Sequence, residues 1–349
     1  MTNRKDKMRQ ALFTAPGELK IEDAEIPDPA RDQVRVRVEA CGICGSDRAI
    51  FIGNEPVSPP VVLGHEFAGV VVARGPEVEG LQVGDRVAID PNIVCGRCPF
   101  CRRGQINLCS RLTPLGIALP GGFAEYSLVP ESNAYRMSDS ISFEEAALVE
   151  PLSCCIRGIH QAGVQLGDVV VVLGAGPIGL LLIQLARLRG AGTVIVVEPD
   201  AERRGIAATL GADIQVDGLV PDADREAVMA ATRNVGADVV IEASGRASAA
   251  AASLTLIRPG GTIVWFGVCP PRDRVAVAPF LVNKRELSIR GSNLNPFTHQ
   301  MALTLIERGR VRVVELISDE IGLDGLRAAI DPAGPQFGGK VIVKPGKTT

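Results

Sequence analysis

The sequence predicts an α/β protein of two domains, a β-rich domain followed by a doubly wound parallel sheet. Its 349 residues suffice for two domains at roughly 150 residues each. Near residue 155 the pattern changes from short β-branched runs between Gly, Pro and Asp turns to strands that alternate with helix-length segments. We therefore expect residues 1–156 to form the first domain and residues 157–292 the second. Residues 293–349 lie outside the alternating series and are expected to return to the first domain.

Each half contains its own kind of element. The short runs of the first half are Val34–Val38, Val61–Val62, Gly69–Val72 and Arg86–Ile89, a pattern typical of an antiparallel β domain. The buried parallel strands predicted for the second half are Asp168–Leu173, Thr193–Val197, Asp238–Ile241 and Gly261–Phe266. The helices predicted between them are Ile178–Arg189, Ala201–Leu210 and Ala247–Leu256. The tail predicts a helix over Gln300–Arg308 and a last strand over Lys340–Val343.

Composition excludes several classes of partner. Lys and Arg total 37 against 40 Asp and Glu, so the net charge of -3 provides no basic surface for nucleic acid or anionic lipid. The uncharged stretch Val169–Ala186 is long enough to span a bilayer, but its glycines and Pro177 favour a buried strand, a turn and a helix. The charged N-terminus has no apolar region of the signal-peptide kind. We expect a cytoplasmic protein with a small-molecule substrate.

Four cysteines form the strongest motif in the sequence. Cys95, Cys98, Cys101 and Cys109 lie within fifteen residues, and Gly96, Pro99 and Gly104 lie between them. Four thiolates at such spacing suit a tetrahedral structural zinc site, which is coordinatively closed and stabilises a loop. The two-residue spacings also occur in ferredoxins, but Cys109 is too distant for the bacterial iron–sulfur pattern and no second cluster motif appears.

A second group of candidate metal ligands contains Cys44, His65 and Glu66. Glu66 directly follows His65 and lies just after an apolar run, Val61–Leu63. Burying its charge would cost several kcal/mol unless it were paired or bound to a metal. Cys, His and Glu are suitable ligands for a catalytic zinc that keeps one coordination position open. The alternative is that Cys44 is an ordinary core residue.

The Gly-rich turn Gly174-Ala175-Gly176-Pro177-Ile178-Gly179 predicts a dinucleotide site, because it follows a strand and opens a helix. Glu198, at the end of the next strand, is expected to accept hydrogen bonds from the adenosine ribose, which favours NAD over NADP. Arg203 and Arg204 argue the other way, because an arginine there can bind a 2′-phosphate. Gly267 and Val268, just after the strand Gly261–Phe266, are further candidates for cofactor binding.

Together these segments resemble the zinc-dependent medium-chain dehydrogenases, in particular their sorbitol (polyol) dehydrogenase-like branch. The matching segments are CGICGSD at Cys41–Asp47, GHEFAG at Gly64–Gly69, the four-cysteine lobe, EPLS at Glu150–Ser153 and the Gly-rich turn. The resemblance covers essentially the whole chain. It implies a GroES-like catalytic domain (1–156 with 293–349), a Rossmann NAD-binding domain (157–292), and a homo-oligomer, a dimer or tetramer.

The resemblance also implies individual roles. Cys44, His65 and Glu66 match ligands of the catalytic zinc, and Glu150 matches an acid that binds this zinc directly or through water. Ser46 matches the hydroxyl that accepts the substrate proton, and Asp47 a partner that orients His65. Many relatives have a proton-relaying His where this chain has Ala49. Asn293 and Asn295 lie in a segment, GSNLNPFTH, that resembles substrate-binding segments of polyol dehydrogenases, although turn residues before a helix would look the same.

We therefore expect NAD-dependent oxidation of a secondary alcohol of a polyol or sugar alcohol, reversible as ketose reduction, with one catalytic and one structural zinc. A cyclitol or a threonine-like amino alcohol is the alternative substrate. Two other classes are a zinc-free NADPH-dependent reductase and a non-catalytic nucleotide-binding protein. The candidate zinc ligands and Ser46 argue against both. The other four of the nine cysteines, Cys41, Cys154, Cys155 and Cys269, are expected to be small buried residues.

Overall fold

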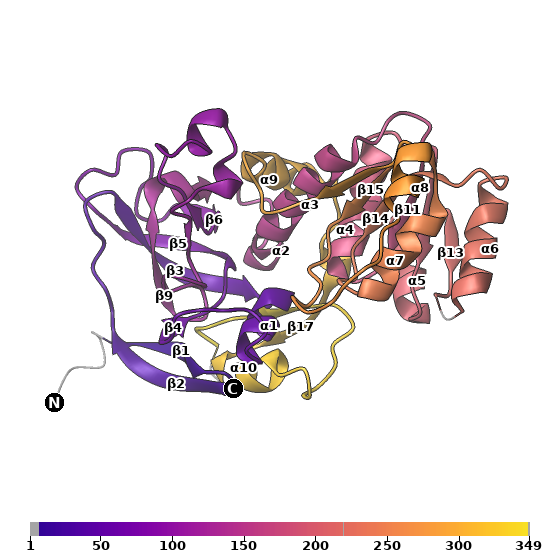
Figure 1. Cartoon of the computed structure of the whole chain (residues 1–349). Helices are drawn as coiled ribbons and strands as arrows, with labels where there is room; N and C mark the ends of the chain where they lie inside the picture. The colour runs from indigo at the N-terminus through magenta and orange to yellow at the C-terminus, as the bar shows by residue number, and fades with distance from the viewer. Residues whose placement is uncertain (1–6, 219, 348–349) are drawn as a thin grey trace. The chain divides into compact units, whose positions relative to one another are not determined.

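The computed structural model describes residues 7–218 and 220–347 and contains two compact units (Figure 1). One unit comprises Met1–Ser153 with Pro296–Thr349, and the other Cys154–Asn295. The division falls inside one helix, α3 (Val149–Ala162). The first unit is rich in β-sheet and the second is built on a parallel sheet, so the predicted α/β class is confirmed. The domain limits expected from the sequence, 1–156 with 293–349 and 157–292, stay a prediction.

The first unit is organised around the long strand β3 (Gln33–Gly42), which pairs antiparallel with β5, β9 and β18. The larger sheet contains β10 (Ala134–Arg136), β6 (Arg86–Ile89), β5 (Glu66–Arg74), β3, β18 (Lys340–Val343) and β17 (Ile317–Ile321) in that order, with β9 (Tyr126–Pro130) also on β3. The smaller sheets are β2 (Glu18–Glu25), β1 (Lys7–Ala15) and β4 (Val61–Val62), and β7 (Asn92–Ile93) with β8 (Thr113–Pro114). The helices are α1 (Gly45–Phe51), α2 (Phe143–Ala147), α9 (His299–Glu307) and α10 (Leu323–Ile330), with short 3-10 turns at Cys101–Arg103, Ile106–Leu108, Glu131–Asn133 and Val314–Leu316.

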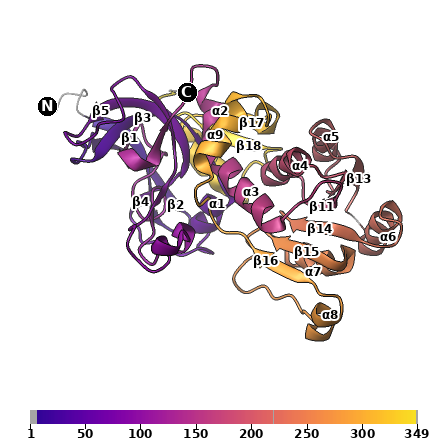
Figure 2. The same cartoon turned by 90° about the horizontal axis from the view of Figure 1, so that it is seen from above.

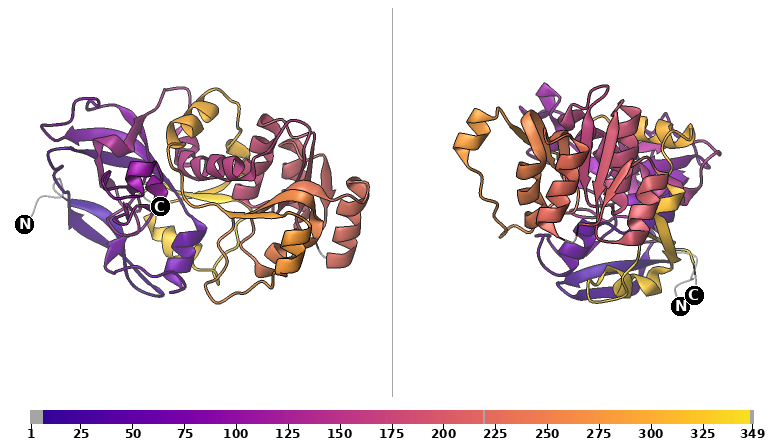
Figure 3. Two further views of the ribbon diagram at one scale, coloured as in Figure 1. Left: turned by 45° about the horizontal axis from the view of Figure 1, so that its top comes forward. Right: turned by 90° about the vertical axis from the view of Figure 1, so that its right-hand side faces the viewer.

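The last part of the chain completes this unit, and Figure 3 shows its yellow strands beside the indigo part of the chain. On β18, Ile342 pairs with Gly42 and Val343 with Cys41. The predicted last strand, Lys340–Val343, is therefore confirmed and lies beside the end of β3. This pairing brings Lys340 close to the segment that carries Cys44, although almost three hundred residues separate them.

The second unit contains one six-stranded parallel sheet (Figure 2). Its strands follow the order β13 (Ile214–Val216), β12 (Thr193–Val197), β11 (Val169–Leu173), β14 (Ala237–Glu242), β15 (Ile257–Trp265) and β16 (Ser288–Gly291). The helices are α4 (Pro177–Leu188), α5 (Ala201–Thr209), α6 (Pro221–Ala231), α7 (Ala247–Leu256) and α8 (Pro279–Lys284). The chain runs outward from β11 in one direction and from β14 in the other. The carboxyl ends of β11 and β14 therefore form the topological switch point, where such sheets bind ligands.

The uncharged stretch Val169–Ala186 forms the first strand and helix of this unit. Residues Val170–Val172 of β11 are fully buried at the centre of the sheet, and Gly174 ends the strand. Pro177 then begins α4. Proline is suited to this position, because the N–H that it lacks would have no partner within the helix. Across residues 7–218 and 220–347, none of the helices has both the length and the apolar character needed to span a bilayer.

A buried histidine is the least expected feature of the first unit. His299, at the start of α9, is 1 % exposed, and its ring packs on Tyr135 with 4.7 Å between ring centroids. Among the described residues neither ring nitrogen has a hydrogen-bond partner. Burial therefore lowers the pKa of His299 to about 3.

The buried His299 predicts an acid-sensitive fold. Between pH 6.5 and 3 the unfolded imidazole binds a proton that the folded one does not, so the free energy of unfolding falls as pH falls. At pH 5 this loss amounts to ~2 kcal/mol relative to pH 7. We expect His299→Phe, which keeps an aromatic ring on Tyr135, to flatten this part of the pH profile in urea unfolding. An unchanged slope between pH 7 and 5 would show that His299 is not the responsible group.

Candidate metal centres and dinucleotide site

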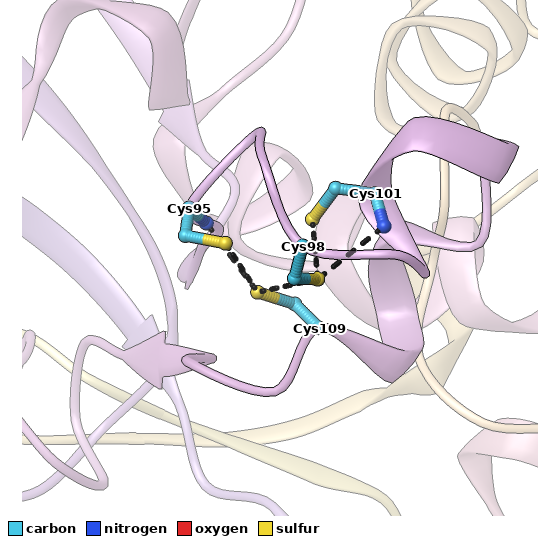
Figure 4. Close-up of side chains that lie close together, drawn as sticks. All are labelled: Cys95, Cys98, Cys101 and Cys109. Carbon is cyan, nitrogen blue, oxygen red and sulfur yellow. Dashed lines mark hydrogen bonds between the residues drawn. The ribbon is translucent and has the colours of Figure 1, made fainter.

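The four predicted cysteine ligands converge in the loop between β7 and β8 (Figure 4). Their sulfur atoms all lie within 4.8 Å of one another. The Sγ–Sγ distances are 3.5 Å for Cys98–Cys101, 4.0 Å for Cys98–Cys109 and 3.5 Å for Cys95–Cys109. Tetrahedral Zn–S bonds of about 2.3 Å require sulfur atoms about 3.8 Å apart. The spacing of the four sulfurs therefore fits one zinc ion.

Backbone N–H groups point at two of the four sulfur atoms. Main-chain N–H groups of Cys95 and Arg111 point at the sulfur of Cys109, both at 3.4 Å, and that of Cys101 points at Cys98 at 3.5 Å. The hydrogen bond from the Cys101 backbone is the main reason that the pKa of Cys98 falls to about 5. Gly96 and Gly104 have φ of +66° and +74°, which allows the chain to fold around the sulfurs. Deprotonated thiols are the form that binds zinc.

The second predicted ligand group also converges. Cys44, His65 and Glu66 place their ligand atoms within 4.8 Å of one another. Cys44 is the N-cap residue of α1, while His65 and Glu66 stand at the start of β5. His65 and Glu66 are 7 % and 1 % exposed. A soft thiolate, an imidazole and a carboxylate form a donor set that suits zinc and leaves a fourth position for another ligand.

Asp47 and Ser46 lie against the two nitrogens of His65. The Asp47 carboxylate accepts a hydrogen bond from the Cys44 N–H at 2.8 Å and faces His65 Nδ1 at 3.5 Å, an electrostatic contact longer than a well-formed hydrogen bond. Ser46 Oγ lies 3.4 Å from His65 Nε2. Burial alone would lower the pKa of His65, but Asp47 and then Cys44 raise it well above its usual value. The role of Asp47 in orienting the His65 imidazole stays a prediction.

The sequence did not predict the partner of Glu66. Lys340 Nζ donates to both carboxylate oxygens of Glu66, at 2.6 and 2.8 Å, and to the Ile43 carbonyl at 3.1 Å. Lys340 is 6 % exposed. Gly42 is needed beside this pair, because a Cβ at that position would lie 2.3 Å from Glu66 Oε2. The buried Glu66 charge is thus paired, and each oxygen keeps a further lone pair for a metal.

Glu150 lies outside the three-residue cluster. It is 6 % exposed in the first turn of α3. Burial lowers the pKa of Lys340, while the charges of Glu66 and Cys44 raise it. The charge of Glu150 raises the pKa of Lys340 as well, by a smaller amount. Glu150 is therefore close to the cluster, and its role as a direct or water-mediated zinc ligand stays a prediction.

The Gly-rich turn lies at the switch point between β11 and β14. Gly174 has φ of +101°, and a Cβ on it would lie 3.2 Å from Ser244 Cβ. A Cβ on Gly179 would lie 1.9 Å from the Gly174 carbonyl oxygen, so α4 can approach the turn only with glycine there. Gly176 is the N-cap of α4, and Pro177 and Ile178 form its first turn. Glycine is therefore required by geometry at positions 174 and 179, whereas a Cβ on Gly176 would meet nothing within 4 Å. The N–H groups at the start of the helix can bind phosphate.

Glu198 lines a cavity of about 360 Å³ next to this turn. Its two oxygens accept hydrogen bonds from the N–H groups of Ala175, at 2.7 Å, and Asp200, at 3.0 Å. Arg203 lines the same cavity, whereas Arg204 instead donates to the Glu198 and Pro199 carbonyls. Two further arginines that the sequence did not single out, Arg225 and Arg246, also line it. The cavity thus offers both carboxylate and guanidinium groups to a ribose.

The remaining predicted residues occupy varied positions. Gly267 is required by space, because a Cβ there would lie 2.2 Å from the Gly245 nitrogen, while Val268 is 89 % exposed. Asn293 is exposed and Asn295 buried, and their role in substrate binding stays a prediction. Cys41 and Cys155 are buried as expected. The expectation is wrong for Cys154 and Cys269, which are partly exposed because they stand on the surface of α3 and in the loop after β15.

Comparison with known proteins gives a consistent result. Residues 30–139 match the alcohol dehydrogenase GroES-like domain and residues 177–308 the zinc-binding dehydrogenase domain. The chain is 36% identical to D-arabitol-phosphate dehydrogenase of Enterococcus avium, covering 93% of this chain and 94% of that protein. It is 33% identical to sorbitol dehydrogenase of Bacillus subtilis, covering 93% of each.

Among solved structures, a zinc-binding dehydrogenase from Sinorhizobium meliloti, described as bound to NADP, superposes with a TM-score of 0.92. It is 41% identical and the match covers 97% of this chain and 99% of that one. The GroES-like and Rossmann-type folds expected from the sequence are confirmed by these matches. The chain belongs to the zinc-dependent medium-chain dehydrogenases, in their polyol dehydrogenase-like branch.

Proposed function

We propose that this protein transfers a hydride from a secondary alcohol of a polyol or sugar alcohol to NAD, reversibly as ketose reduction. The observation that carries the proposal is the cluster of Cys44, His65 and Glu66, with the Ser46 hydroxyl 3.4 Å from His65 Nε2. Three different metal ligands beside a hydroxyl suit alcohol oxidation, whereas the four-cysteine site is closed and suits a structural role.

We assign metal binding and proton transfer to different residues of the chain. Cys44, His65 and Glu66, with Glu150 nearby, would hold the catalytic zinc, and Cys95, Cys98, Cys101 and Cys109 the structural one. When bound, zinc supplies Lewis-acid polarisation of the substrate oxygen and the nicotinamide accepts the hydride. Ser46 would accept the substrate proton at Oγ while its own proton passes to water. Asp47 would keep the His65 imidazole oriented as a zinc ligand.

NAD is the proposed dinucleotide. The Gly174–Gly179 turn would bind the pyrophosphate, and Glu198 lines the cavity beside it, where its charge disfavours a 2′-phosphate. The contrary observation is that Arg203, Arg225 and Arg246 line the same cavity, and that the Sinorhizobium relative is described with NADP. We expect Gly267 and Val268 to approach the nicotinamide end.

The oligomeric state and the cellular location are two further parts of the proposal. We propose a homo-oligomer, a dimer or tetramer, because members of this group commonly assemble that way. We propose a cytoplasmic location because none of the nine cysteines, all within the described ranges, forms a disulfide and four of them are grouped as metal ligands, which suits a reducing compartment.

A dehydrogenase screen tests the proposed function. The holoenzyme is assayed for NADH formation over linear polyols, cyclitols, L-threonine and simple secondary alcohols, each with NAD and with NADP. We expect the largest kcat/KM for a linear polyol with NAD, and a fall in the NAD preference in Glu198→Gln because the negative charge is removed. Higher efficiency with NADP would overturn the cofactor assignment, and absence of polyol turnover would overturn the substrate class.

A further inference from the structure

Glu242 is a buried carboxylate at the carboxyl edge of the parallel sheet. It is the last residue of β14, where it pairs with Leu173 at the end of β11 and with Trp265 at the end of β15. Its side chain is 0 % exposed. One carboxylate oxygen, Oε1, accepts from the N–H groups of Ser244 and Gly245, at 2.7 and 2.9 Å, and from the Ser244 hydroxyl at 2.5 Å. These three bonds fix the carboxylate in one orientation.

The other oxygen of Glu242, Oε2, is buried and has no hydrogen-bond partner within residues 7–218 and 220–347. It lies against the loop after β15, since a Cβ on Gly267 would come within 2.6 Å of Oε2. Among the described residues no basic side chain forms an ion pair with Glu242. A buried carboxylate with an unpartnered oxygen and no counter-ion is unfavourable for folding. A positive charge on a bound ligand would offset this cost.

The surroundings of Glu242 belong to the proposed dinucleotide site. Ser244 packs on the Gly-rich turn, because a Cβ on Gly174 would lie 3.2 Å from Ser244 Cβ. Sheets with this strand order bind the two halves of a dinucleotide on the two sides of the switch point. Glu198 follows β12 and, under the proposed function, binds the adenosine ribose on that side. The nicotinamide half is thereby assigned to the side of β14 and β15, where Glu242 and Gly267 lie (Figure 1).

We propose that Glu242 provides a fixed negative charge at the nicotinamide end of this site and so favours binding of NAD+ relative to NADH, compared with a neutral side chain at the same position. The inference rests on the proposed function and deepens it by assigning a preference between the two redox forms of the cofactor. The oxidised ring carries a positive charge that the reduced ring lacks, whereas the diphosphate and the riboses are the same in both. Because the packed strands exclude water, the charge of Glu242 is little screened and acts without direct contact.

The test measures the dissociation constants of NAD+, NADH and ADP-ribose, which lacks the nicotinamide, on the zinc-loaded protein by titration calorimetry. Glu242→Gln removes the charge and keeps an oxygen that can accept from Ser244 and Gly245. We expect the Kd of NAD+ to rise on the order of tenfold relative to that of NADH, the size of an attraction between unit charges about 10–12 Å apart at an effective dielectric constant of about 20. The Kd of ADP-ribose should change less than about threefold.

Two further variants complete the design. Glu286→Gln is the matched control, because Glu286 is exposed in the turn before β16, at the amino end of the strands. It removes the same charge and should leave all three dissociation constants unchanged. If Glu242→Gln does not fold, Val268→Lys replaces it: Val268 is exposed beside Gly267, and a positive charge there should also weaken NAD+ relative to NADH. An unchanged ratio in that variant would overturn the proposal.

The possible failures have different signatures. An equal weakening of NAD+ and NADH by Glu242→Gln would show that Glu242 only holds the loops in place, and would overturn the inference. A wild-type protein that binds neither form of the cofactor would instead overturn the proposed dinucleotide site. A protein in which Glu242 has the expected effect on cofactor binding but which oxidises no alcohol would refute the proposed function and leave this inference standing.

Discussion

Cys44→Ser is expected to abolish most dehydrogenase activity while leaving the fold intact. The variant removes the only thiolate from the cluster of Cys44, His65 and Glu66, so zinc content should fall from two ions per chain to one. Loss of the metal removes several kcal/mol of charge stabilisation at the substrate oxygen. At 1.36 kcal/mol per factor of ten, kcat should fall on the order of a thousandfold. Metal analysis and the NADH assay on the same samples check both numbers.

The control for this experiment is Cys154→Ser, because Cys154 belongs to neither cluster of ligand atoms. It should retain two zinc ions and wild-type turnover. Dinucleotide binding provides a further check, since the Gly-rich turn lies in the other compact unit and should bind NADH normally in both variants. Two zinc ions and full activity in Cys44→Ser would show that the cluster is not the catalytic metal site.

Features whose parts are close together in the sequence were predictable. The structural zinc site is an example: its four sulfurs come from fifteen residues, and glycine at 96 and 104 allows the loop to close. The Gly-rich turn is another, because close packing of a strand, a turn and a helix requires glycine at 174 and 179. In both cases the geometry is imposed by local backbone constraints that appear in residue types and spacing.

Features that depend on long-range pairing were not predictable. Lys340 reaches Glu66 only because β18 pairs with β3, and nothing near Lys340 in the sequence marks it as buried. Glu198 lines the cavity beside the Gly-rich turn, and its predicted contact with a ribose stays a prediction. Its hydrogen bonds to two backbone N–H groups, which the sequence did not predict, stabilise the turns around it.

Lys340→Met is expected to destabilise the protein by an amount that depends on the catalytic zinc. Lys340 and Glu66 form a buried pair with 2.6 Å between Nζ and Oε2. Removing one partner of such a pair costs about 3–5 kcal/mol, because the remaining charge stays buried and unpaired. Methionine has a similar length and no charge, so packing changes little. Without the metal, the whole cost should appear in the free energy of unfolding measured in urea.

A bound zinc ion would change this result, because it provides a second positive partner for Glu66. We therefore expect Lys340→Met to cost about 3–5 kcal/mol in the Cys44→Ser background, where the catalytic site is empty, and clearly less in the zinc-loaded enzyme. Adding Glu66→Gln to both backgrounds should remove the difference, because the buried charge is then gone. An equal cost with and without the metal would mean that Glu66 belongs to the ion pair alone and does not ligate zinc. The comparison uses stability and needs no turnover. It therefore shows whether the zinc ion stabilises the Glu66 carboxylate in addition to Lys340.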